Sequence, residues 1–183
     1  MMCDAVEECA LDNGSVVKIY YDDAVESPRE WDNLGIMACF HNRYMIGDKD
    51  HGINGDDFES WDEMEEYIWN ELDAVVVLPV HLYNHSGLAF NTTGFSCPWD
   101  SGQIGFIFTT KRKIKEFYGD VEITDEFKEK LENHLRSEIE VYEQYANGQI
   151  YYYVIYDKDG ELTDSCGGFY GIDTIKEELG IKE

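Results

Sequence analysis

Apolar residues fall into short runs typical of β-strands, separated by stretches with helical spacing. Strands are predicted over residues 15–21, 35–41, 74–83, 88–92, 103–109, 149–156 and 161–169. The run 74–83 is the most apolar and predicts a central strand, with a bulge or an edge at Pro79 because proline donates no ladder hydrogen bond. Strands and helices alternate without a regular βαβ order. We therefore predict an α+β fold, a single domain whose mostly antiparallel sheet packs with two to four helices.

The clearest helix is predicted to begin after Ser60. Ser60 and Glu63 have the spacing of a capping box, in which each side chain bonds the other residue's backbone amide. Trp61, Met64, Ile68 and Leu72 recur at helical spacing and predict an inward-facing stripe.

Three more helices follow, over residues 111–118, over 124–146 with Thr124 as its cap, and from about Asp173. The sequence Asp157–Gly160 predicts a hairpin turn between the last two strands. Residues 1–14 are expected to form a flexible N-terminal segment, and residues 15–183 a single acidic α+β domain.

The net charge is more informative about function than any motif in the chain. The 183 residues include 39 acidic and 14 basic ones, a net charge of −25, yet 14% are aromatic. Disordered acidic chains are poor in aromatic residues, so we expect a folded core under one strongly acidic face. Repulsion of phosphates argues against direct nucleic-acid binding, and the chain has neither a secretory signal pattern nor an apolar run long enough to cross a membrane. We expect a protein of the host cell cytoplasm.

Carboxylates cluster in the first half of the chain, where residues 1–80 hold 20 acidic and four basic residues. The predicted partner-binding residues are Asp48, Asp50, Asp56, Asp57, Glu59, Asp62, Glu63, Glu65, Glu66 and Asp73. Self-repulsion disfavours a compact state, so we expect the charge to serve a partner with a basic surface, such as a CRISPR effector or a restriction enzyme. Asp48–Glu59 also has the length of a calcium-binding loop, but Ile53 stands where that loop requires glycine, which favours a plain acidic loop.

A second candidate site combines His81, His85, Cys97 and Asp100. Cys97 is a candidate nucleophile with a histidine base, and His81, His85 and Cys97 are weak candidates for a structural zinc site. No sequence signature of a cysteine hydrolase accompanies them. The plainer interpretation is a packed corner anchored by Trp99. We expect no cofactor, with a structural zinc ion at these residues as the alternative.

Three segments resemble a family of small acidic proteins carried by phages, prophages and plasmids: SPREWDNLG (27–35), FSCPWDSGQIGFI (95–107) and DSCGGFYG (164–171). The resemblance covers about residues 15–172. It implies a mobile-element setting, in which small acidic proteins often block host restriction or CRISPR nucleases and some imitate DNA. It implies no catalytic residue. Within the first segment, Arg29 is expected to pair with a carboxylate internally.

The sequence therefore favours a non-enzymatic anti-defence inhibitor, of the anti-CRISPR or anti-restriction type, that binds a basic nucleic-acid channel as a DNA mimic. The alternative is a small metal-dependent or cysteine-based enzyme around His81, His85, Cys97 and Asp100. A third hypothesis gives the acidity only a solubilising role. A salty habitat is disfavoured because ten of the 14 basic residues are lysine.

Overall fold

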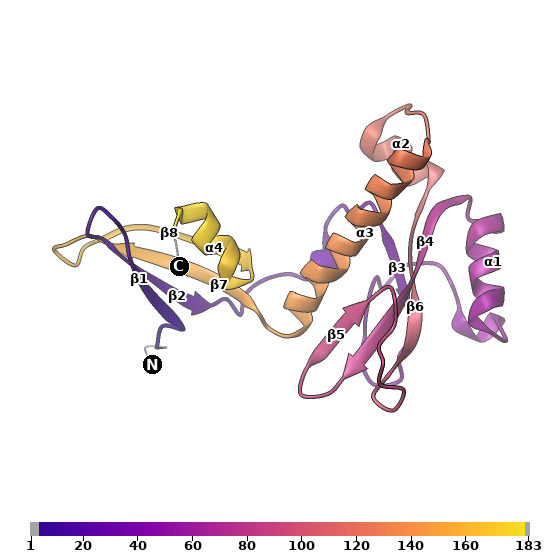
Figure 1. Cartoon of the computed structure of the whole chain (residues 1–183), viewed down its shortest axis with the longest axis horizontal. Helices are drawn as coiled ribbons and strands as arrows, with labels where there is room; N and C mark the ends of the chain where they lie inside the picture. Colours follow the sequence, from indigo (N-terminus) through magenta and orange to yellow (C-terminus); the bar gives the residue numbers. More distant parts are fainter. Residues whose placement is uncertain (1–3, 182–183) are drawn as a thin grey trace. The chain divides into compact units, whose positions relative to one another are not determined.

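The computed structural model describes residues 4–181, which form two compact units (Figure 1). One unit contains the two ends of the chain, up to residue 27 and from residue 144, and the other contains residues 28–143. Each unit is built on a four-stranded antiparallel sheet. The predicted α+β class with antiparallel pairing is confirmed, and the strands are divided between two sheets.

The terminal unit has the strand order β1-β2-β7-β8. Its elements are β1 (Glu7–Ala10), β2 (Val16–Tyr21), β7 (Ile150–Tyr156), β8 (Leu162–Tyr170) and α4 (Ile172–Leu179). Ile175 of α4 is fully buried in a cluster with Val17 and Ile19 of β2. Within the N-terminal segment 1–14, β1 pairs with β2, and the first three residues lie outside the described part of the chain.

The central unit has the strand order β3-β6-β4-β5. Its elements are η1 (Pro28–Glu30), β3 (Ile36–Cys39), η2 (Gly55–Asp57), α1 (Trp61–Glu71), β4 (Ala74–Asn84), β5 (Leu88–Asn91), β6 (Ser101–Thr110), α2 (Lys111–Tyr118) and most of α3 (Asp125–Ala146), where η denotes a short 3-10 helix. β4 pairs on both sides, and its pairing with β6 shifts between Val80 and His81, next to Pro79. The predicted central strand and its irregularity are confirmed.

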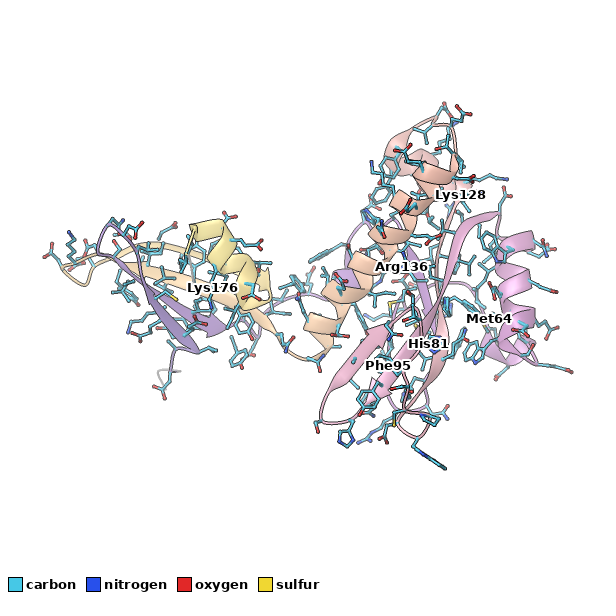
Figure 2. All side chains as sticks on the ribbon, viewed as in Figure 1. Met64, His81, Phe95, Lys128, Arg136 and Lys176 are labelled. Atoms are coloured by element: carbon cyan, nitrogen blue, oxygen red, sulfur yellow. The ribbon has the colours of Figure 1, made fainter. Side chains whose placement is uncertain are left out.

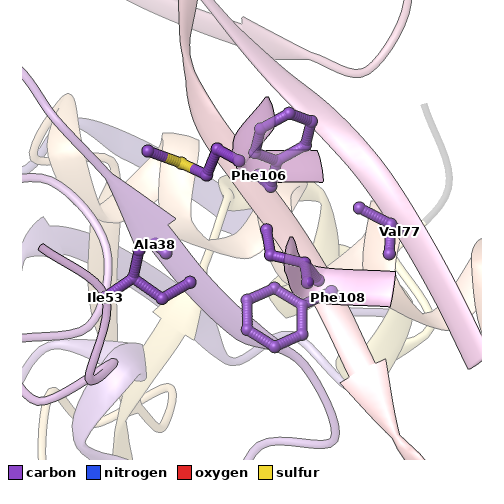
Figure 3. Close-up of a cluster of buried hydrophobic side chains, with 7 residues drawn as sticks. Ala38, Ile53, Val77, Phe106 and Phe108 are labelled. Atoms are coloured by element: carbon purple, nitrogen blue, oxygen red, sulfur yellow. The ribbon is translucent and has the colours of Figure 1, made fainter. Parts of the chain in front are cut away.

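One core cluster of the central unit lies between α1 and the sheet (Figure 3), and α3 contributes the buried residues Leu131, Leu135 and Ile139. Met64 (labelled in Figure 2) and Ile68 are buried against Phe106 and Phe108 of β6, as the predicted stripe requires. Gly105 lets β3 approach β6 closely, because a Cβ there would collide with the Ala38 carbonyl. Among the described helices, none is long and apolar enough to cross a membrane.

Candidate functional site

The loop before α1 and the first turns of α1 carry most of the predicted partner-binding residues. Asn54 caps η2 by accepting a hydrogen bond from the Asp56 amide, and Gly52 turns the chain at φ +76°. Ser60 Oγ accepts the Glu63 amide at 3.2 Å, and Glu63 Oε2 accepts the Glu59 amide at 2.7 Å. The Ser60 half of the predicted capping box is confirmed, whereas Glu63 bonds the amide of Glu59 and not that of Ser60. The two bonds together fix the direction in which α1 leaves the loop.

The predicted acidic residues differ in what surrounds them. Eight of the ten have exposed side chains: Asp50, Asp56, Asp57, Glu59, Asp62, Glu63, Glu66 and Asp73. Glu65 is half-buried and accepts the Trp69 indole N–H at 3.4 Å, while Asp73 forms an ion pair with Lys111 at 2.8 Å. The charge of Asp73 is thus partly compensated within the protein.

Asp48 is turned into the protein. Its Oδ1 lies 2.6 Å from Nε of Arg29, and its Oδ2 accepts the Met37 amide at 2.8 Å. The same guanidinium pairs with Glu138 of α3 at 2.8 Å, so the predicted internal pairing of Arg29 is confirmed. Asp48 is therefore a structural carboxylate, and the first position of the calcium-loop alternative already has a cationic partner.

The stretch of chain that follows Lys49 is strongly acidic. Residues 50–72 contain nine acidic residues and no lysine or arginine. Within residues 4–181, no ion pair joins any of those nine carboxylates to a basic side chain. These nine carboxylates thus form no ion pair within the described part of the chain, and a basic partner can complement their charge.

A cavity of about 720 Å³ opens beside the start of α1, and we call it the aromatic cavity. It is lined by Phe40, Lys49, His51, Gly52, Ile53, Asn54, Gly55, Asp56, Phe58, Glu59, Ser60, Trp61 and Met64. Sequence reasoning missed it, because Phe40 follows β3 and meets the loop and α1 only in the folded chain. The aromatic residues Phe58 and Trp61 within an otherwise acidic stretch were the available signal.

The second candidate site brings three of its four residues together. Asp100 Oδ2 lies 3.9 Å from the Cys97 sulfur and 3.6 Å from His85 Nδ1. The Asp100 carboxylate thus contacts both the Cys97 thiol and the His85 ring. A catalytic cysteine is activated by a base in direct contact with its thiol, and here the carboxylate holds that position. Trp99 is 91% exposed, so the expectation that it anchors a packed corner is wrong.

His81 stands apart from these three residues. Its ring lies beside Gly94, where an added Cβ would be 3.7 Å away, and burial lowers the pKa of His81. Figure 2 labels His81 near Phe95 in this region. No group of three or more His, Cys, Asp or Glu side chains arranged to hold a metal ion occurs among the described residues.

No protein-family model, curated protein or solved structure matches this chain. The functional argument accordingly rests on the geometry and charge described above.

Proposed function

We propose that this protein is an anti-defence inhibitor, which occupies the basic nucleic-acid channel of a host restriction enzyme or CRISPR effector as a DNA mimic. It acts in the host cell cytoplasm, as a binding protein that needs no cofactor. The carboxylates of the 50–66 segment take the place of phosphates opposite the lysine and arginine side chains of that channel.

The observation that carries the proposal is the series of exposed carboxylates along residues 50–66 that form no ion pair within the described part of the chain. Opposite charges steer two proteins together and raise the association rate, and salt weakens this effect steeply. Duplex DNA presents one charge per about 1.7 Å of its axis, so a mimic needs its carboxylates close together. The bonds of Ser60 and Glu63 at the start of α1 support this arrangement by fixing α1 to the acidic loop.

A cleavage assay tests the proposal with a panel of purified restriction enzymes and CRISPR nucleases. The test variant combines Asp50→Lys, Asp57→Lys, Asp62→Lys and Glu66→Lys, all at exposed positions outside the aromatic cavity. The control combines Asp159→Lys, Glu161→Lys, Glu177→Lys and Glu178→Lys, which are also exposed and change the net charge equally.

We expect at least one nuclease to be inhibited in competition with its DNA. The test variant should raise the inhibition constant about 100-fold, because like charges placed opposite each other cost several kcal/mol. The control should change it less than about threefold. Circular dichroism and thermal unfolding establish that both variants fold.

Three results would contradict the proposal: inhibition of no nuclease in the panel, inhibition that excess DNA does not relieve, or equal losses in the two variants. The Cys97→Ala variant distinguishes the proposed function from the enzymatic alternative, since it should leave inhibition by charge unchanged. Loss of inhibition in that variant would favour cysteine chemistry.

A further inference from the structure

We infer that the aromatic cavity binds a guanidinium group, the side chain of an arginine that projects from a basic protein partner. This inference takes its partner from the proposed function, and it adds a site that recognises one kind of side chain to a surface that otherwise acts through charge.

Four of the thirteen residues that line the cavity carry an aromatic ring: Phe40, His51, Phe58 and Trp61. The rings of Phe40 and Trp61 lie 6.3 Å apart, centre to centre, and the rings of Phe40 and His51 lie 5.3 Å apart and nearly perpendicular. Phe40, Phe58 and Trp61 are all half-buried and pack against the core cluster, which holds their positions while leaving part of each residue accessible. Aromatic faces attract cations, and arginine more often than lysine takes this position in proteins.

Gly55 leaves room for the Phe40 ring. A Cβ at Gly55 would lie 2.8 Å from Cδ1 of Phe40, so any other residue would force the ring or the loop to move. The loop before α1 therefore packs closely against Phe40, the residue that follows β3.

The rim of the cavity is acidic. Asp56 and Glu59 both line it, both are exposed, and neither forms an ion pair in the described part of the chain. A guanidinium presents a planar fork of N–H donors that matches carboxylates and stacks on aromatic rings at the same time. The combination of rim and walls thus fits arginine better than a simple ammonium ion.

Two basic side chains lie in the lining and do not fill the site. Lys49 has its ammonium 2.8 Å from the carboxylate of Glu30. Burial lowers the pKa of His51, although the negative charges of Asp48 and Asp50 act to raise it. The lowered pKa favours a neutral imidazole at pH 7. His51 Nδ1 accepts the Ile53 amide at 3.2 Å, so the ring acts as a wall of the cavity.

Other occupants fit less well. An anion would be repelled by the two rim carboxylates, and a neutral apolar group would cover them without offering them a hydrogen bond. The volume of the cavity falls within the usual range for ligand sites, roughly 300–1,000 Å³, and gives room for the side chain of arginine.

The test is a titration of the nitrogen-15-labelled protein with the peptide acetyl-Gly-Arg-Gly-amide, followed by nuclear magnetic resonance. The matched peptide carries citrulline, which has nearly the same shape as arginine and no charge. We expect the arginine peptide to shift the Trp61 indole and the amides of the loop before α1, and to bind about tenfold more tightly than the citrulline peptide.

Paired variants locate the effect. Asp56→Asn with Glu59→Gln should weaken binding of the arginine peptide about tenfold, because both changes remove rim charges that accept its hydrogen bonds. The control pair, Asp159→Asn with Glu161→Gln, makes the same charge change at exposed positions outside the cavity lining and should alter binding less than about twofold. Trp61→Leu should also weaken binding, and the rim pair decides the question if that variant does not fold.

The inference is overturned if citrulline binds as well as arginine, if the shifts lie elsewhere, or if the two pairs weaken binding equally. The outcome is separate from that of the cleavage assay. Peptide binding without nuclease inhibition would support the arginine site and contradict the proposed function. Inhibition without peptide binding would support the proposed function and contradict the arginine site.

Discussion

Arg29 explains why the segment SPREWDNLG has its composition. Its side chain is 3% exposed and its guanidinium bonds Asp48, Glu138 and the Gly35 carbonyl. Glu138 in turn accepts the amides of Leu34 and Gly35, each at 3.0 Å. Burial disfavours the charge of Arg29, but the two carboxylates more than offset this and raise its pKa. The segment therefore joins η1, the loop after β3 and α3 through one buried cation.

We predict that Arg29→Met destabilises the protein by about 3–5 kcal/mol, because it leaves two largely buried carboxylates without their cation. Arg112→Met is the matched control. Arg112 is 77% exposed and its partner Glu116 lies 3.8 Å away, so the cost should be about 0.5 kcal/mol or less. Urea denaturation measures both.

The triple variant Arg29→Met, Asp48→Asn, Glu138→Gln should recover part of the lost stability, since no uncompensated charge remains buried. Equal effects of the two arginine variants would show that the buried network contributes no more than a surface ion pair.

At the scale of the element, α1 shows which parts of the structure could be predicted from sequence. Its cap, its inward stripe and its bounds depend on residues within one or two turns of each other, and all follow from local spacing. The division into two sheets depends on pairing between distant strands, such as β2 with β7, and no local pattern specifies it. The exposed carboxylates of the site were predictable because charged side chains rarely lie buried.

The remaining parts of the site could not be predicted, because they depend on contacts between residues that are far apart in the chain. Asp48 looked like its acidic neighbours, and only the fold brings it to Arg29, 19 residues away, and brings Arg29 to Glu138, 109 residues away. The aromatic cavity likewise needs Phe40, the loop and α1 in one place.

We predict that Ser60→Ala lowers the free energy of unfolding by about 1 kcal/mol, because the Glu63 amide loses its acceptor at the start of α1. Hydrogen exchange should also become faster at the first amides of α1. The control is Ser137→Ala, an exposed position within α3, which should be close to neutral. If Ser60→Ala leaves both the stability and the exchange of α1 unchanged, the Ser60 cap does not stabilise the helix.

At the scale of the whole molecule, the net charge of −25 has two opposite consequences for salt dependence. Self-repulsion opposes folding, so screening by salt should stabilise the protein. Attraction to a basic channel favours binding, so the same screening should weaken inhibition. A purely solubilising charge would produce the first effect without the second.

We therefore predict that raising the salt concentration from about 20 mM to about 500 mM increases the midpoint of thermal unfolding by about 5 °C or more while weakening nuclease inhibition at least about tenfold. Each of the two quadruple lysine variants changes four charges by two, which takes the net charge from −25 to −17. Both should therefore lose a similar part of the salt-dependent stabilisation, because that effect depends on total charge. Only the 50–66 variant should lose inhibition, because that effect depends on where the charges lie. Inhibition that is insensitive to salt, or that falls equally in both variants, would mean that the position of the carboxylates is unimportant and that the acidity serves the protein's solubility alone.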